Sequence, residues 1–415
     1  MSFTQEPEEK WKLGNTIFFR FVFSYFVLYI LLIFLQHFLE TPLRWFATNI
    51  LHWGEDFEMH STGSGDMTTH YVVLGFTIVL ALLFGTVWTI MERKRRSYHK
   101  LFHWFQIILR VLLLFSMLLY GFAKIFKGQF PDPSLERLLQ PVGDMSPMGL
   151  AWTFMGHSLV YNIFIGFAEV LGGVLMLYRK TVTLGSLIII GVMTNVAMMN
   201  FTYDIPVKLL SVHLVLIAMI LLLADRKRVM NFFFRNKTAE KVVHRFNFKN
   251  KTLVKLISIG KILILAIVVI AVAVQSLVQF EAQDQLKMKS EFYGIWETQL
   301  FVKNNDTLPP LLTDSYRWRY LILDQKRKAV VKKMNDSLDR YIFEANSELH
   351  EIVIRRASDS IPQWFSYNFL DAQQLQLRGA VDGDSLFIRF KQKPESSFRL
   401  INREFHWVNE YPYNK

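Results

Sequence analysis

The chain has 415 residues, of which 52% are hydrophobic and 37 are Phe, and its mean hydropathy is +0.22. This is more apolar than ordinary soluble proteins and predicts an integral membrane protein. The formal charge is +12, but much of the Lys and Arg surplus lies in short segments between apolar runs, which indicates membrane topology and not nucleic-acid binding. The absence of cysteine excludes disulfides, thiolate nucleophiles and thiolate metal sites.

Seven apolar segments are long enough to cross a hydrocarbon core of about 30 Å as helices. They are 18–38, 72–91, 105–126, 151–178, 182–201, 207–224 and 256–278. The first follows an acidic start and no small-residue cleavage site follows it. It is therefore interpreted as a span, not as a cleaved signal peptide.

Lys and Arg alternate between the connecting segments in a way that predicts orientation. Segments 92–100, 179–180 and 226–255 are basic, whereas 39–71 has only Arg44 and 128–150 has only Arg137. Since basic segments stay on the cytoplasmic side, we expect these three segments to be cytoplasmic. The N-terminus would then be cytoplasmic and the C-terminal part extracytoplasmic.

Five regions follow from these patterns. They are an N-terminal membrane segment with two helices and an outer loop (1–103), a four-helix membrane domain (104–228), a basic cytoplasmic linker (229–255), a seventh transmembrane helix (256–280) and an extracytoplasmic β domain (281–415). The outer segment 128–150 is rich in Pro and Gly, so it cannot continue a helix. It either lies on the outer surface or dips partly into the membrane.

The last region has the period-two pattern of strands separated by turn signals. Strands are predicted at 295–302, 317–323, 328–334, 338–344, 349–355, 364–370, 373–379, 384–391 and 397–402. Sequential strands with short turns favour an up-and-down antiparallel β-barrel. The tripeptide Gly294-Ile295-Trp296 resembles the Gly-x-Trp start of lipocalin-like barrels. The simpler interpretation is that Trp296 closes one barrel end without any ligand.

Two charges inside predicted spans are expected to face each other. Arg110 lies on one helical stripe with Gly121, and Glu169 lies on another with Gly166. Glycines allow neighbouring helices to approach closely, and both charges lie at a similar distance from the cytoplasmic side. We therefore predict an intramembrane ion pair between Arg110 and Glu169, either fixing the bundle or serving its function.

A second polar group gathers toward the predicted outer side of the spans. Its members are Tyr120, Lys124, His157, Tyr161, Asn195, Asn200, Asp204 and Lys208. Amides, phenols, an imidazole and amines can bind a quinone carbonyl or an anionic group. The alternative is that some members cap helices or extend to the interface, Asp204 and Lys208 above all.

Histidines elsewhere give no defensible metal or haem motif. The first outer loop contains His52, His60 and His70 with Glu55, Asp56 and Glu58, but their spacing matches no metal site, so no metal is assigned. His99 and His103 are spaced as on one helical turn, and an interfacial position explains them better. The sequence contains no phosphate loop, dinucleotide motif or nucleophile elbow.

Residues 104–228 resemble the DoxX family of bacterial membrane proteins. The resemblance is carried by Arg110 with the run Tyr-Gly-Phe-Ala-Lys at 120–124, by Gly-Phe-Ala-Glu-Val-Leu-Gly-Gly at 166–173, and by 200–208. It implies a four-helix membrane unit and a location in the bacterial inner (cytoplasmic) membrane. Some family members are subunits of quinone-linked sulfur-oxidation or thiol-stress complexes.

Two classes of function follow. In the first, the bundle binds a quinone or a similar lipid-like molecule and a protein partner transfers electrons. In the second, the protein is a non-catalytic envelope anchor or transporter whose outer β domain binds a ligand or partner. The lipid bilayer is a partner in both, and the sequence identifies no catalytic residue.

Overall fold

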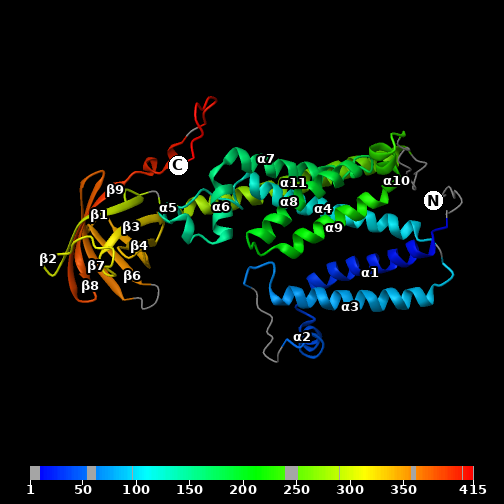
Figure 1. Cartoon of the computed structure of the whole chain (residues 1–415), viewed down its shortest axis with the longest axis horizontal. Helices are drawn as coiled ribbons and strands as arrows, with labels where there is room; N and C mark the ends of the chain where they lie inside the picture. Colours follow the sequence, from blue (N-terminus) through cyan, green and yellow to red (C-terminus); the bar gives the residue numbers. More distant parts are fainter. Residues whose placement is uncertain are drawn as a thin grey trace. The chain divides into compact units, whose positions relative to one another are not determined.

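The computed structural model describes residues 10–53, 62–95, 97–238, 251–288, 290–356, 361–403 and 405–414. The chain forms two compact units (Figure 1). The first comprises Met1–Ile125 with Ile163–Val274 and is helical, and the second comprises Phe126–Asn162 with Gln275–Lys415 and contains the strands. The segment 126–162 is thus grouped with the β domain, and it includes the first part of the predicted span 151–178.

Within the described part of the chain, five helices are long and apolar enough to span a membrane. They are α1 (Leu13–Leu35), α3 (Thr68–Met91), α4 (His99–Ile125), α8 (Val182–Thr202) and α11 (Lys251–Leu286), in which the stretch Ala266–Leu286 meets this criterion. Two bent pairs raise the count to seven if each is one span: α6 (Pro147–His157) with α7 (Leu159–Val174), and α9 (Lys208–Ala224) with the helical segment Arg226–Phe234. The protein is therefore a multi-pass membrane protein.

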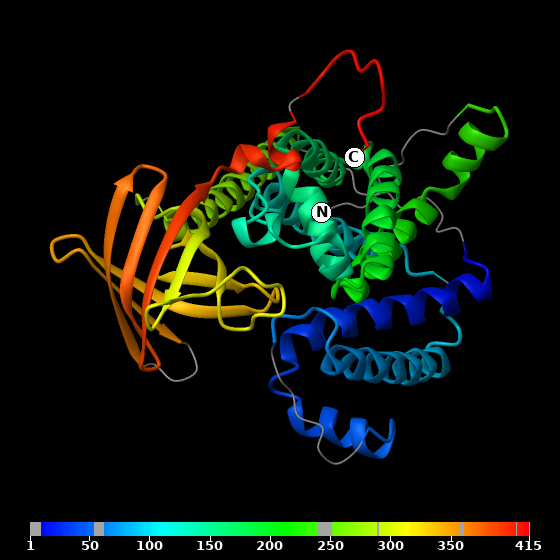
Figure 2. The same cartoon turned by 60° about the vertical axis from the view of Figure 1, so that its left-hand side comes forward.

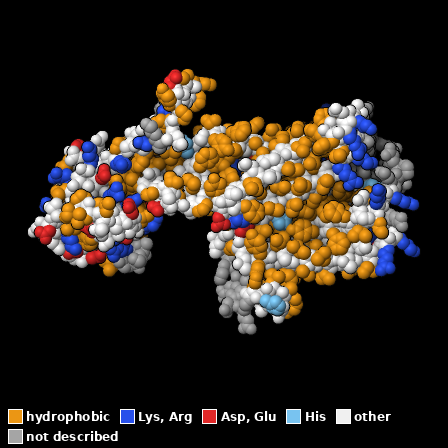
Figure 3. Space-filling view, viewed as in Figure 1, with side chains coloured by type: hydrophobic (Ala, Val, Ile, Leu, Met, Phe, Trp, Pro, Cys, Tyr) orange, Lys and Arg blue, Asp and Glu red, His pale blue; other side chains and the backbone are white. Residues whose placement is uncertain are grey.

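The outer surface of the helices is apolar, as a lipid environment requires. At most 33% of the most apolar stretch of any of the five helices is buried within the protein, and hydrophobic side chains dominate the helical surface (Figure 3). The amphipathic helix α2 (Glu40–Asn49) instead buries Leu43 and Phe46 in a small core with α3 residues. The predicted span 151–178 differs from a straight helix, because α6 and α7 meet at a 98° bend next to Ser158.

The β domain is a closed antiparallel barrel of eight strands, as the alternating pattern predicts. The strands are β1 (Gly294–Lys303), β3 (Trp318–Gln325), β4 (Lys328–Lys333), β5 (Leu338–Asn346), β6 (Glu351–Arg356), β7 (Pro362–Asp371), β8 (Gln374–Val381) and β9 (Asp384–Lys393), and β2 (Asp306–Thr307) only extends the β1 hairpin. Each long strand pairs with the next, and β9 pairs with β1 to close the ring. Figure 2 shows the strands arranged around a common axis.

The predicted ninth strand, 397–402, is wrong. This segment contains the short helical elements η3 (Glu395–Ser397) and α12 (Arg399–Asn402) instead. Pro394, which directly precedes them, has no backbone N–H to donate to a neighbouring strand. Moreover, the pairing of β9 with β1 leaves no free edge to which a further strand could add.

The barrel interior is filled by side chains. Trp296, Phe301, Phe365 and Phe390 are at most 1% exposed and belong to one apolar core with residues from every long strand. An eight-stranded barrel is just wide enough to be filled in this way. The interior is therefore a packed core, and Trp296 is one of its members.

A short helix covers one patch of the outer barrel wall. In α5 (Leu135–Leu138), Leu135 packs on outward-facing Ile295, Tyr320 and Ile322. The Leu135 N–H donates to Asp324 Oδ2 at 3.1 Å. Further contacts fix the same segment: Lys332 Nζ donates to the Leu139 carbonyl at 3.1 Å, and Arg340 pairs with Glu136 at 2.5 Å.

Candidate functional site

Two helices of the bundle are in backbone contact through glycines. A Cβ atom added to Gly121 of α4 would lie 2.7 Å from the Gly166 carbonyl oxygen, and one added to Gly166 would lie 2.6 Å from the Gly121 oxygen. A Cβ at Gly173 would lie 2.8 Å from Met117 Cβ. Since no real Cβ fits at such distances, these glycines are what allows α4 and α7 to touch.

This contact buries a pair of opposite charges. Lys124 Nζ of α4 lies 2.9 Å from Glu169 Oε2 of α7, and the two residues are only 4% and 1% exposed. The ring centroid of Tyr120 lies 5.8 Å from the same Nζ. A charged pair inside an apolar bundle is costly unless both partners are present, and such groups usually mark function in membrane proteins. Lys124 can donate to a carbonyl or an anion, and the pair can accept or release a proton.

The predicted pair between Arg110 and Glu169 does not form. Arg110 Nε and Nη2 instead donate to the carbonyls of Met176 and Leu177 at 2.7 and 2.6 Å, just beyond the C-terminal end of α7, where helix carbonyls lack intrahelical partners. The reason is the antiparallel register of the two helices. With Gly121 against Gly166, Glu169 lies beside Lys124, whereas Arg110 is 14 residues away along α4, a rise of about 21 Å.

Three other predicted site residues have partners around the connection from α8 to α9. The amide nitrogen of Asn200 donates to Ser211 Oγ at 3.1 Å and to the Val207 carbonyl at 3.2 Å. Lys208 Nζ lies 2.9 Å from Asp204 Oδ1, and the Asp204 carboxylate is largely exposed. These contacts close a turn and place a pair at the surface, which fits the capping alternative.

The remaining predicted members do not join the buried pair. Asn195 is exposed on α8. His157 ends α6 and Tyr161 lies near the start of α7, both exposed and both in the second unit. Of the eight predicted residues, the structure therefore brings together Tyr120 and Lys124, and adds Glu169 to them.

The loop histidines form no metal site in the part of the chain that the structure describes. His52 is exposed, and His70 Nδ1 accepts a hydrogen bond from the Met67 N–H at 3.2 Å. His60, Glu55, Asp56 and Glu58 lie outside the described residues. His99 accepts from the Trp11 indole at 3.3 Å.

A buried arginine in the first span was not among the predicted site residues. Arg20 of α1 is 1% exposed and donates to the Tyr98 hydroxyl at 2.9 and 3.1 Å and to the Glu92 carbonyl at 2.8 Å. The Tyr98 hydroxyl in turn donates to the Glu92 carboxylate, which lowers the pKa of Glu92, helped by the Trp88 indole. A lone arginine within the apolar segment 18–38 was the available signal.

A second missed group ties the end of α9 to the turn before α8. Arg179 donates to both oxygens of Asp225 at 2.6 and 2.7 Å, and the Thr183 hydroxyl donates at 2.7 Å. These hydrogen bonds satisfy the buried Asp225 carboxylate, which is 7% exposed. This bidentate ion pair links the C-terminal end of α9 to the turn before α8.

A third missed group contains a histidine. His213 of α9 is 4% exposed; its Nε2 lies 2.7 Å from the Tyr25 hydroxyl of α1, and its ring stacks on Tyr29 with centroids 4.0 Å apart. Its Nδ1 lies 2.6 Å from the Leu209 carbonyl. The Nε2 contact thus joins α1 to α9, while the Nδ1 contact lies within α9.

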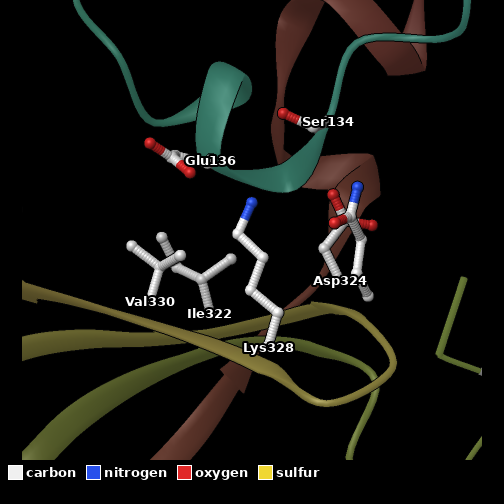
Figure 4. A pocket seen from close by; sticks show the side chains of 7 residues that line it. Ser134, Glu136, Ile322, Asp324, Lys328 and Val330 are labelled. Carbon is white, nitrogen blue, oxygen red and sulfur yellow. The ribbon is translucent and has the colours of Figure 1, made fainter. Parts of the chain in front are cut away.

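The β domain has a small pocket beneath α5 (Figure 4). Its volume is about 60 Å³, and its lining is formed by Ser134, Glu136, Ile322, Asp324, Gln325, Lys328 and Val330. Burial raises the pKa of Asp324 despite the hydrogen bond from Leu135. The pocket has room for about two water molecules and is too small for a quinone ring.

The fold and the buried Lys124–Glu169 pair define the class: a multi-pass membrane protein with a C-terminal β-barrel domain. No family model matches the chain, and no solved structure matches it. Over 126 residues it is 38% identical to the uncharacterized protein YwoB of Bacillus subtilis (strain 168), and the aligned part is 30% of this chain and 79% of YwoB. The chain therefore belongs to the family of YwoB.

Proposed function

We propose that the protein is a DoxX-like subunit of the bacterial inner membrane that holds a quinone-type headgroup beside Lys124, Glu169 and Tyr120. The observation that carries this proposal is the ion pair of 2.9 Å between two almost inaccessible side chains. An apolar pair of similar size would stabilise the bundle as well, and ionisable side chains within membrane spans are rare and usually functional. An ammonium beside a phenol is suited to hydrogen bonding with a quinone carbonyl.

The proposed orientation has the N-terminus in the cytoplasm and the barrel outside. Its support is the gathering of Lys and Arg at the end of the helical unit where α10 (Arg226–Val229) lies (Figure 3). In the seven-span count, Arg93 and Lys94 follow the second span, and Arg179 and Lys180 follow the fourth. Both loops therefore lie on the side of the membrane where the chain would begin and where the sixth span ends. Basic residues on one side set the orientation of bundles.

In this proposal the bundle positions the quinone and a partner protein supplies or removes the electrons. Reduction of a quinone consumes protons as well as electrons. The Lys124 ammonium and the Glu169 carboxylate share a hydrogen bond, so a proton can move between them. We propose that Lys124 gives such a proton to the bound headgroup as a general acid. The proposed DoxX-like unit, residues 104–228, contains all three side chains of the site.

The test is the amount of quinone retained after gentle extraction, measured by mass spectrometry. Lys124→Met alone and the double variant Lys124→Met/Glu169→Leu should both lose retained quinone, whereas Lys180→Met, at an exposed lysine, should not. The double variant removes the charged pair as a whole and so separates lost binding from lost folding. Wild-type protein without quinone, or a folded double variant that retains it, refutes the proposal.

The alternative is a non-catalytic anchor or transporter whose barrel recognises a ligand or partner. One observation shapes it: the barrel interior is filled by Trp296, Phe301 and other aromatic side chains. Under this alternative, the lipocalin-like domain would use its outer wall or its turns for recognition, not an internal cavity. This alternative would be favoured if the wild-type protein captures a specific partner and neither the protein nor the partner contains quinone.

A further inference from the structure

The chain ends in an aromatic segment that is not packed on the barrel. Its large side chains are exposed to 76% at Phe405, 91% at Trp407, 72% at Val408, 84% at Tyr411 and 47% at Tyr413. The rings contact one another, with Phe405 and Trp407 centroids 5.0 Å apart, and the Arg403 guanidinium lies 4.3 Å from the Tyr413 ring. Trp and Tyr are the residues that favour the boundary between membrane and water, because each has an apolar body and a polar tip.

This segment leaves the barrel at the same rim at which the C-terminal end of α11 lies. Lys393, the last residue of β9, pairs with Ile295 at the start of β1. The Tyr293 hydroxyl, just before β1, donates to Glu395 Oε1 at 2.9 Å. At the same rim, the Lys326 N–H in the turn between β3 and β4 donates to the carbonyl of Leu286, the last residue of α11, at 2.8 Å. The end of α11, the start of β1 and the end of β9 thus lie at the same end of the barrel.

The rim and the aromatic segment carry exposed basic side chains. Lys326 and Arg327 lie in the turn between β3 and β4, Lys391 lies near the end of β9, and Arg399 and Arg403 precede the aromatic residues. Arg327 is paired with Glu344, and Glu410 adds an acidic group to the segment. Basic residues next to exposed aromatic ones are the combination that binds surfaces of acidic lipids.

The distances allow the segment to reach the bilayer. The continuous apolar run of α11 ends near Val278, so the polar turns up to Leu286 add a rise of only about 12 Å. The stretch from Lys393 to Phe405, in which Glu395–Ser397 and Arg399–Asn402 are helical, can span roughly 25–30 Å. A segment that starts at this rim therefore has ample length to meet the surface from which α11 emerges.

We propose that residues 405–414 bind the surface of the bilayer that α11 crosses and act as a second, interfacial attachment of the barrel. Trp407, Tyr411 and Tyr413 occupy the headgroup region, and Arg399 and Arg403 pair with acidic lipids. The barrel is then held by two points at one rim, which restricts its rotation about the α11 axis.

The absence of native cysteine allows a direct test in the full-length protein. Val408→Cys is labelled with an environment-sensitive fluorophore and reconstituted in vesicles of phosphatidylcholine and phosphatidylglycerol that contain brominated lipid. The expected result is blue-shifted emission that the bromine quenches. The control, Asp306→Cys in β2 near the opposite rim, should give water-like emission without quenching. Replacing Trp407, Tyr411 and Tyr413 by Ser should move the label at position 408 toward the control.

Three results would overturn the proposal. The first is equal, water-like emission from both label positions in the vesicles. The second is shielding of the label at position 408 only when several copies share a vesicle, and not in nanodiscs with a single copy, which would identify a second copy of the chain as the occupant. The third is shielding in native membranes but not in vesicles of purified protein, which would identify another protein.

Discussion

At the scale of single residues, Lys124 and Glu169 depend on each other. Removing one partner of a buried pair leaves an uncompensated charge and costs about 3–5 kcal/mol, while replacing both by apolar groups of similar size is nearly neutral. Lys124→Met and Glu169→Leu should therefore each lower the folded yield and the thermal stability in detergent, and the double variant should recover most of the loss.

Arg110 provides the matched control for the single and double variants of Lys124 and Glu169. It is bound to the carbonyls of Met176 and Leu177 and not to Glu169. The stability losses of Arg110→Met and Glu169→Leu should thus add in a double variant, without recovery. Recovery in the Arg110/Glu169 variant, together with additive losses in the Lys124/Glu169 variant, would restore the pairing expected from the sequence.

Asp324 predicts a pH dependence of stability in the β domain. Burial raises its pKa above the usual 3.8, so the folded state binds this proton more tightly than the unfolded chain. The stabilising contribution is full below about pH 4 and is lost as the pH rises through the raised folded pKa. Asp324→Asn keeps an oxygen that can accept from the Leu135 N–H but removes the titration.

The measurement for Asp324 is thermal stability against pH for the full chain in detergent. The profile of Asp324→Asn should fall less steeply than that of the wild type above pH 4, and the exposed control Asp306→Asn should follow the wild type. A slope that Asp324→Asn leaves unchanged would show that this carboxyl does not control the profile.

At the scale of elements, the contact between α4 and α7 depends on glycine. Gly121→Ala and Gly166→Ala would each place a Cβ within 2.7 Å of a backbone oxygen on the other helix, so the helices must separate, at a cost of about 1–3 kcal/mol. Gly191→Ala in α8 is the matched control, because a Cβ there meets nothing within 4 Å. It should be neutral or stabilising by up to about 1 kcal/mol through helix propensity. Equal losses at Gly191 and Gly121, measured by thermal unfolding in detergent, would contradict the close contact.

The existence of the elements was predictable, and their pairing was not. Apolar runs such as 182–201 and alternating strands such as 384–391 carry their own periodicity, so the helices and the barrel strands follow from local pattern. The partner of Glu169 depends on the register between two helices, which no local pattern contains. The bend at Ser158 and the helical turn at 399–402 likewise depend on neighbouring segments.

At the scale of the whole molecule, the run Tyr320–Leu321–Ile322–Leu323 does not alternate between apolar and polar residues. All four residues are buried, because one face of β3 packs inside the barrel and the other lies under α5. A continuous apolar run is typical of a strand covered on both faces, whereas the wall of an exposed barrel alternates. The run therefore indicated that a segment from elsewhere in the chain covers this strand.

Because α5 packs on the outer face of β3, we expect the segment 126–162 to stabilise the barrel. Leu135→Ala removes a side chain that is 2% exposed from the cover and should cost about 2–5 kcal/mol. Val142→Ala, at a residue that is 67% exposed, should change little. Loss of the strand signal in circular dichroism, followed with temperature, measures both. An unchanged melting temperature for Leu135→Ala would show that α5 rests on the barrel without stabilising it.

The pairing of β1 with β9 has a consequence for biosynthesis. The ring cannot close until Lys393 has left the ribosome, because the final strand must reach back across the whole domain to Ile295. Until then, both terminal strands expose unpaired backbone groups that can recruit other chains. Such long-range closure is also slow, since its entropic cost precedes its gain. A chain that is truncated within β9 should therefore aggregate or be degraded, even though most of its barrel strands are present.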